Sequence, residues 1–243
     1  MSSILKLTYH EYVKRRVFVV STILYGLVVI ALLFGIGGNT DYLINPYFLS
    51  FLFYLSLLFL IFSGFDTIPR MIEDGSVELL LSRPIGRIRL LIYKYVSTIL
   101  VVPISTFFFF LSISIIYFIK TGTLNLIFLR IFIFTSLAFA IYYAAVLPVA
   151  LLFYRSNLNM LICLALIVAN VLPNLVKWMT MGQVELVKNY LIGLFYIISP
   201  RLVELYGLAV STGKGPITTL AYSVVYVLLC LSISVAIISR KDF

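Results

Sequence analysis

The sequence predicts an all-α polytopic membrane protein with six transmembrane helices. Of its 243 residues, 63% are apolar and only 11% are charged, and the mean hydropathy is +1.14. A soluble domain is about 45–50% apolar and about 25% charged, so a water-soluble fold could not bury this much apolar surface. The apolar runs are continuous and too long for barrel strands, which favours helices. These observations exclude an ordinary soluble enzyme, a disordered tail and a secreted disulfide scaffold.

Six stretches are long enough to cross about 30 Å of hydrocarbon as helices. Pro103, Pro148 and Pro173 fall inside three of them and are expected to kink the helices. The first stretch is full length and has no small-residue cleavage pattern, so we expect a retained helix rather than a signal peptide. The chain 1–243 then forms one membrane domain, with spans at 17–36, 47–66, 96–119, 126–153, 158–176 and 217–239.

Lysine and arginine set the expected orientation. With the amino terminus inside, twelve of them lie on the inner side, five lie on the outer side, and Arg130 lies inside a span. The positive-inside rule therefore places both termini in the cytoplasm and the chain in the cell membrane. The net charge of +9 is explained by this orientation, so no nucleic-acid partner is expected.

The amino-terminal segment 2–16 is predicted to be a helix in the inner membrane interface. Its apolar residues Leu5, Tyr9, Tyr12 and Val13 recur at helical spacing, and Lys6, His10 and Lys14 recur four apart on another face. Such a helix places its aromatic side in the membrane and its cations against anionic headgroups. The alternative is a plain cytoplasmic extension of the first span.

The inner loop 67–95 contains a short apolar helix where a simple turn would suffice. Ser76 can cap a helix that begins after Gly75. The helix ends at Arg83, because a residue before proline avoids helical angles. A cytoplasmic helix this apolar, with a charged rim, has the character of a docking element. The alternative is an ordinary loop shaped only by membrane insertion.

The segment EDGSVELLLSRPIGRIRLLIYKY resembles the signature of the type 2 ABC transporter permeases. The family shows an acidic residue, Gly-Ser/Thr, a Glu, a Leu-rich triplet, and then Pro-x-Ser-Arg and a Lys. Gly86 departs from the pattern, because many members have Ser there. The opening YHEYVKRRVFVV and the whole layout of spans are also similar. The matching positions are Glu73, Gly75, Ser76, Glu78, Leu79, Leu80, Leu81, Ser82, Pro84, Arg87 and Lys94.

The resemblance implies the membrane half of an ATP-driven transporter, usually an exporter. Two permease chains, identical or related, would pair, and each would sit on a separate ATPase subunit that binds ATP and Mg²⁺. The loop helix 73–83 would be the coupling helix that docks on the ATPase. The coupling residues carried over are Glu73, Asp74, Gly75, Ser76, Glu78, Leu79, Leu80, Leu81 and Arg83.

The chain itself contains no nucleotide-binding loop. A P-loop needs Gly-x4-Gly-Lys-Ser/Thr, and the near match at Gly213-Lys214-Gly215 fails because position 208 is Leu and Gly follows the Lys. We therefore expect no catalytic, metal-binding or cofactor-binding residues in this chain. Cys163 and Cys230 are most simply small packing residues.

Few polar side chains fall inside the spans. Thr98, Ser105 and Ser112 recur every seven residues and share a helix face. They either hydrogen-bond to neighbouring helices or line a substrate pathway. Arg130 either reaches the outer headgroups or lies at a pathway or dimer interface. Outside the spans, the segment 177–200 repeats apolar residues at helical spacing and is predicted to be an amphipathic outer helix.

Two other functions remain open from the residues alone. A membrane anchor or force-transmitting subunit could dock an ATPase and transport nothing. A stand-alone carrier or channel is disfavoured by the scarcity of ionisable groups in the spans. The substrate is not defined by the sequence.

Overall fold

The computed structural model describes residues 2–14, 16–35, 41–64, 86–153, 161, 162, 165, 202–210 and 217–240. Within these ranges the chain is helical apart from short turns and contains no strand. The helices are α1 (Ser2–Val13), α2 (Arg16–Gly35), α3 (Asp41–Ile44), α4 (Pro46–Gly64), α7 (Arg87–Val101), α8 (Pro103–Thr121), α9 (Ile127–Phe153), α12 (Leu202–Val210) and α13 (Ile217–Arg240).

Four helical stretches are long and apolar enough to cross a membrane: Pro46–Gly64, Arg87–Thr121, Ile127–Phe153 and Thr218–Arg240. The apolar part of α2, Phe18–Phe34, is shorter. Helices therefore occupy five of the six predicted spans, and the architecture is that of a multi-pass helical membrane protein. Most of the predicted span 158–176 lies outside the described residues, so the total of six remains a prediction.

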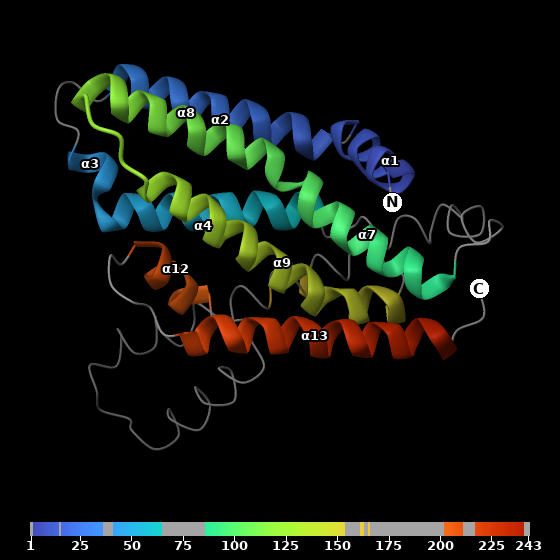
Figure 1. Cartoon of the computed structure of the whole chain (residues 1–243). Coiled ribbons are helices and arrows are strands. Elements are labelled where there is room, and N and C mark those ends of the chain that lie inside the picture. Colours follow the sequence, from blue (N-terminus) through green and yellow to red (C-terminus); the bar gives the residue numbers. More distant parts are fainter. Residues whose placement is uncertain are drawn as a thin grey trace.

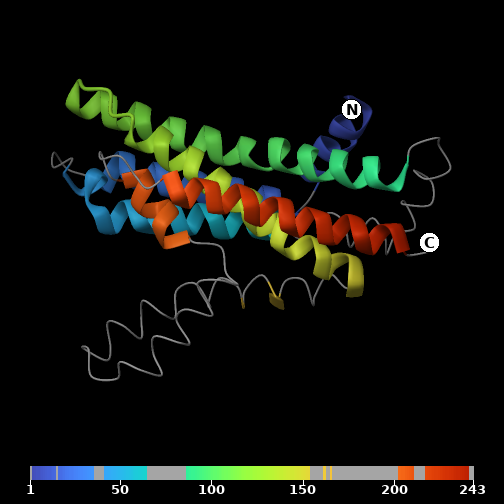
Figure 2. The ribbon, with the colours of Figure 1, turned by 60° about the horizontal axis from the view of Figure 1, so that its bottom comes forward.

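The long helices form a bundle in which neighbours run back and forth along one axis (Figure 1). The start of α1 and the end of α13 lie towards the same end of this bundle. Helix α9 occupies the centre and contacts α4, α7, α8, α12 and α13. The view from a second direction shows α13 and α9 side by side along much of their length (Figure 2).

Local sequence signals place the helix ends. The side chain of Asn45 accepts a hydrogen bond from the Tyr47 N–H at 2.9 Å, and Pro46 between them occupies the first helical position of α4. Asn125 accepts from the Ile127 N–H in the same way at the start of α9. Helix α8 ends at Thr121 and is followed by Gly122, whose φ of 70° is a left-handed conformation that glycine adopts without steric cost.

The prolines act differently in two of the predicted spans. A proline removes one backbone donor and crowds the preceding turn. At Pro103 the helix is divided at Val102 into α7 and α8, which together run from Arg87 to Thr121. The helix also begins nine residues before the predicted boundary at 96, so the apolar span continues into a basic first turn. Pro148 leaves α9 continuous from Ile127 to Phe153.

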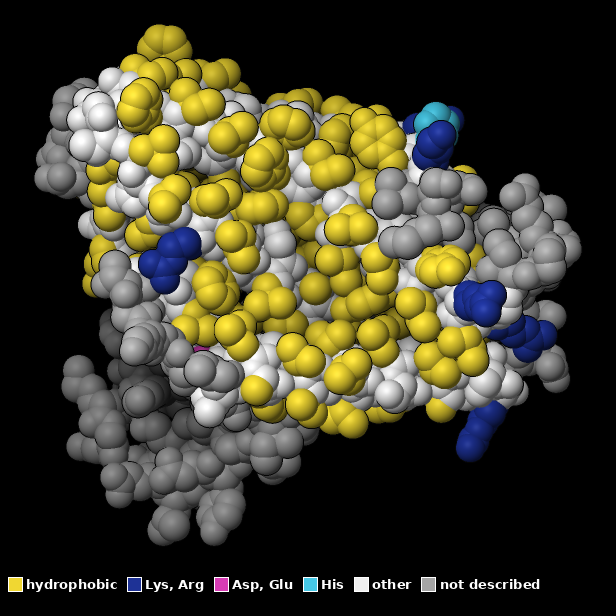
Figure 3. Space-filling view, viewed as in Figure 1, with side chains coloured by type: hydrophobic (Ala, Val, Ile, Leu, Met, Phe, Trp, Pro, Cys, Tyr) yellow, Lys and Arg dark blue, Asp and Glu magenta, His cyan; other side chains and the backbone are white. Residues whose placement is uncertain are grey.

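Hydrophobic side chains spread over the central part of the bundle face seen in Figure 3, and Lys and Arg side chains lie towards its two ends. Much of α2 and α13 is exposed and apolar. A membrane core solvates such a surface, because lipid tails are as apolar as the side chains. This distribution matches a bundle that spans a bilayer, with its charges at the headgroup levels.

Helices α4 and α9 approach each other closely at Gly64. A Cβ atom at Gly64 would lie 2.6 Å from Cζ and 2.8 Å from Cε2 of Phe139. The Phe139 ring is buried, with 1% of its surface exposed, and cannot move into solvent. Gly64 is therefore required for α4 to pack against the central helix at this separation.

We predict that Gly64→Ala destabilises the protein by about 1–3 kcal/mol, because overpacking a filled core forces neighbouring groups to shift. Thermal unfolding of the purified protein in detergent measures the effect. Gly26→Ala in α2 is the matched control, because nothing lies within 4 Å of a Cβ there. Equal melting temperatures for the two variants would contradict the proposed close packing.

Candidate membrane-interface groove

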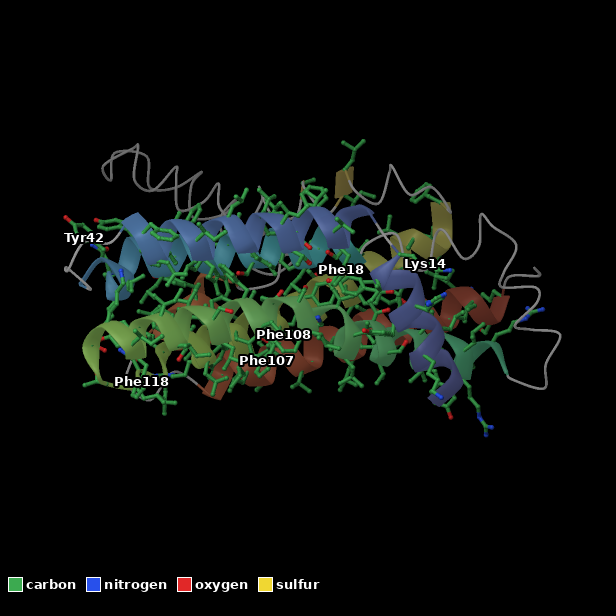
Figure 4. The ribbon with its side chains drawn as sticks, turned by 90° about the horizontal axis from the view of Figure 1, so that it is seen from above. Lys14, Phe18, Tyr42, Phe107, Phe108 and Phe118 are labelled. Atoms are coloured by element: carbon green, nitrogen blue, oxygen red, sulfur yellow. The ribbon has the colours of Figure 1, made fainter. Side chains whose placement is uncertain are left out.

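The amino-terminal helix α1 lies across the bundle rather than along it (Figure 4). Its main partner is α7. The hydroxyl oxygens of Thr8 and Ser97 lie 3.0 Å apart in a buried hydrogen bond. The Tyr12 hydroxyl donates to the Val102 carbonyl at 3.1 Å and lies 2.9 Å from the Ser105 hydroxyl. These contacts fix α1 to the joint between α7 and α8.

Residue spacing accounts for the match between these helices. Thr8 and Tyr12 are four apart and therefore share one face of α1. Ser97 and Ser105 are about two turns apart on the α7–α8 pair, on either side of the division at Val102. The hydroxyls of Thr8 and Tyr12 thus each meet a partner on the α7–α8 pair, and these buried polar groups are satisfied inside the protein.

The structure agrees with the predicted polar face of α1 and corrects one residue of the predicted membrane-facing side. Lys6, His10 and Lys14 are exposed, as expected for a cationic face. Tyr12, which the sequence analysis placed on the membrane side, is instead only 4% exposed and points into the bundle. The physical reason is its hydroxyl, which requires a partner when buried and finds one at the Val102 carbonyl. Tyr9 is half exposed and remains on the outer side of α1.

A groove with a cavity volume of about 360 Å³ lies between α1, α2 and the α7–α8 pair. We call it the interfacial groove. Figure 4 shows Phe18 of α2 and Phe108 of α8 along it, with Lys14 at the α1 end. Its lining residues are Tyr9, Tyr12, Val13, Phe18, Thr22, Tyr25, Gly26, Val29, Val101, Ile104, Ser105, Phe108, Phe109 and Ser112.

Aromatic packing supports the walls of the interfacial groove. The rings of Tyr25 and Phe109 stack at a centroid distance of 4.2 Å and join α2 to α8. At the α1 end, the rings of Tyr12 and Phe18 meet edge to face at 4.9 Å. Aromatic pairs of these geometries add about 0.5–1.5 kcal/mol each beyond the area they bury. The groove is therefore a built feature of three packed elements.

The polar atoms in the groove are largely paired within the protein. Thr22 donates its hydroxyl proton to the Phe18 carbonyl, and Ser112 donates to the Phe108 carbonyl, both at 2.8 Å. Such bonds to the preceding turn satisfy a hydroxyl in an apolar helix. The lining therefore presents hydrocarbon and aromatic surface, with little free hydrogen-bonding capacity to select a strongly polar ligand.

The three polar residues predicted to share a face are divided between two surroundings. Ser105 and Ser112 line the interfacial groove. Thr98 is fully buried, donates to the Lys94 carbonyl at 2.9 Å, and its methyl carbon lies 3.7 Å from the Cβ position of Gly64. Thr98 therefore packs towards α4. For all three residues the hydrogen bonds described run within the chain.

Arg130 lies at the opposite end of the bundle from the termini. Its Nη2 donates at 3.1 Å to the carbonyl of Leu208, in the last turn of α12. At this end Lys120 likewise donates to the carbonyls of Leu32 and Leu33, in the last turn of α2. The last four carbonyls of a helix have no partner within it, and a cation there also complements the helix dipole. Both cations therefore cap helix ends.

Further polar contacts hold α12 in place. The Thr219 hydroxyl donates to a carboxylate oxygen of Glu204 at 2.7 Å and links α13 to α12. The Tyr206 hydroxyl donates to the Pro46 carbonyl at 2.6 Å and links α12 to α4. Desolvation by burial raises the pKa of Tyr206 above its ordinary value.

The predicted coupling helix 73–83 and the predicted outer helix 177–200 lie outside the described residues, as does Cys163. Cys230 is a free, partly buried thiol on α13. Over the described part of the chain, His, Cys, Asp and Glu form no group of three that could hold a metal ion. No family model matches the sequence, and no curated protein matches it.

Sequence reasoning placed Ser105 at a candidate site but missed its hydrogen-bond partner Tyr12 and the groove residue Tyr25. A signal was present in α1, where Thr8 and Tyr12 form a pair of hydroxyls on an otherwise apolar face. Polar atoms on a face assigned to the membrane need a partner. The pair therefore indicated a protein contact rather than a lipid contact.

We predict that Tyr12→Phe loosens α1 by about 1 kcal/mol, because it removes a buried hydrogen bond to Val102 and keeps the ring. Hydrogen exchange of the α1 amides, read by mass spectrometry, should become several-fold faster. Tyr9→Phe, at a half-exposed position on the same helix, should leave exchange unchanged. Unchanged exchange in Tyr12→Phe would show that the hydroxyl does not hold α1.

Proposed function

We propose that this chain is the membrane-spanning permease subunit of an ATP-driven ABC exporter. It would pair with a second permease and couple to two ATPase subunits through the helix 73–83. The observation that supports the proposal is the start of α7, the helix that follows this segment in the chain. Helix α7 begins at the end of the bundle on the side of α1 (Figure 1). A docking element there would sit beside the helix that crosses that end.

The distribution of charge supports a cytoplasmic location for the end of the bundle near α1. Among the described residues, Lys120 and Arg130 lie at the end of the bundle far from α1. The more numerous cations towards the end near α1 are Lys6, Lys14, Arg16, Arg87, Arg89, Lys94 and Arg240. The positive-inside rule then favours a cytoplasmic location for the termini, which is the side where an ATPase would have access to ATP.

The helices themselves favour coupling to a partner over ion-driven transport. None of α2, α4, α7, α8, α9 and α13 contains an Asp or Glu. Ion-coupled carriers use ionisable groups within the membrane to bind and release their ions. The driving force in this proposal comes from ATP hydrolysis by the partner, which would push on the 73–83 segment and, through it, on α4 and α7.

We predict that Leu80→Asp abolishes co-purification of an ATPase with the chain solubilised mildly from its native membranes. A charge in the apolar face of a docking helix would have to be desolvated in the complex, which costs several kcal/mol. Leu124→Asp is the matched control, because Leu124 is 66% exposed in the loop at the opposite end. Absence of any ATPase from the unmodified chain would overturn the proposal.

Substrate-stimulated ATP hydrolysis distinguishes an exporter from a force-transmitting anchor. The complex, reconstituted in vesicles, should hydrolyse ATP faster when its substrate is present, and amphipathic peptides and lipids are the first candidates to screen. Hydrolysis that responds to an outer protein partner, with no substrate moved, would favour the anchor.

We predict that the two ends of the bundle face opposite sides of the membrane. In a background with Cys163→Ser and Cys230→Ser, a cysteine at exposed Leu124 should react with a membrane-impermeant maleimide in intact cells. A cysteine at exposed Tyr9 should react only after permeabilisation. The reverse pattern would invert the topology and place the 73–83 segment away from cellular ATP.

A further inference from the structure

We propose that the interfacial groove binds one acyl chain of an anionic phospholipid, with the headgroup against Lys14 and His10. The site is separate from the helix 73–83 and does not depend on ATP coupling. The ligand comes from the membrane leaflet on the side of the termini.

The length of the groove fits one leaflet. Its lining on α2 extends from Phe18 to Val29, about 16 Å at 1.5 Å per residue. The hydrocarbon core of a bilayer is about 30 Å thick, so one leaflet contributes about 15 Å. A single acyl chain that enters at the α1 end would therefore reach the bilayer midplane within the groove. The cavity of about 360 Å³ also falls within the usual range of about 300–1,000 Å³ for ligand pockets.

The surface of the groove suits a hydrocarbon chain. Phe18, Val29, Ile104 and Phe108 contribute apolar surface, and the hydroxyl of Ser112 is already bonded to its own helix. The absence of a side chain at Gly26 leaves open space, because nothing lies within 4 Å of its Cβ position.

Charge selects the headgroup. Val13 lines the groove, and the next residue, Lys14, directly follows α1 as an exposed cation. His10 lies one turn earlier, and its carbonyl accepts a hydrogen bond from the Lys14 N–H at 3.2 Å, so both side chains leave the same stretch of helix. Lys6 continues this cationic face. Charge complementarity at the mouth and an apolar channel behind it define an amphipathic ligand with an anionic head.

Photo-crosslinking tests the site directly. The purified chain is placed in phosphatidylcholine vesicles with a minor fraction of phosphatidylglycerol that carries a diazirine on one acyl chain. Cross-linked residues are mapped by mass spectrometry. We expect labelling of Thr22, Ile104 and Phe108 several-fold above the exposed α13 residues Leu228 and Ile233. The same diazirine on phosphatidylcholine should label the groove and α13 equally.

Two variants, one with a matched control, test separately the binding of the headgroup and the binding of the acyl chain in the groove. Lys14→Gln should reduce groove labelling by phosphatidylglycerol about fivefold, the worth of one surface cation near an anionic headgroup. Arg240→Gln, an exposed cation at the same end on α13, should leave it unchanged. Gly26→Trp should block labelling by either lipid, and α13 labelling should persist as proof of a folded, embedded protein.

Three outcomes would overturn the proposal. Equal groove labelling by the two lipids would show that charge does not select the occupant. Labelling no greater than on α13 would reduce the groove to ordinary lipid-facing surface. Groove labelling that is low at high protein density and rises when the chain is diluted in the vesicles would assign the groove to a second copy of the chain. None of these outcomes depends on an ATPase partner, so the proposed transport function is tested independently.

Discussion

The structure depends on one constraint, which is that polar groups in an apolar medium must find their partners inside the protein. Hydroxyls along the helices bond to carbonyls of the preceding turn. The guanidinium of Arg130 and the amine of Lys120 bond to carbonyls at helix ends. Tyr12 closes the contact between α1 and the joint at Val102. The same requirement therefore caps two helices and holds the amino-terminal helix across the bundle.

Packing around α9 then determines how these elements meet. It contacts α4, α7 and α8, which precede it in the chain, and α12 and α13, which follow it. The buried ring of Phe139 needs a neighbour without a side chain, and Gly64 provides it. At the periphery the helices are less tightly filled, and the interfacial groove forms where α1 crosses the ends of α2 and α7. The groove that we propose for an amphipathic lipid thus lies at the boundary between a dense core and the lipid.

The proposed permease function joins two parts of the molecule. The sequence motif around Leu80 supplies the candidate docking segment, and the bundle supplies two helices, α4 and α7, through which a push on that segment would travel. A mechanical input needs rigid elements to carry it. The close contact at Gly64 gives α4 a direct connection to the central helix. A lipid bound in the interfacial groove would contact α2 and α8 together, so the lipid composition of the membrane would affect how these two helices pack.

The sequence by itself determined the helical membrane class, five of the helices and the cationic end, because hydropathy and length act locally along the chain. It also predicted α1 as a separate helix. It could not determine which way Tyr12 points, because the partner hydroxyls and carbonyl lie about ninety residues away. Nor could it separate Thr98 from Ser105, since seven-residue spacing assigns both to one face. The tertiary structure decided these points, because the division at Val102 and the approach of α4 and α1 give each residue a different neighbour.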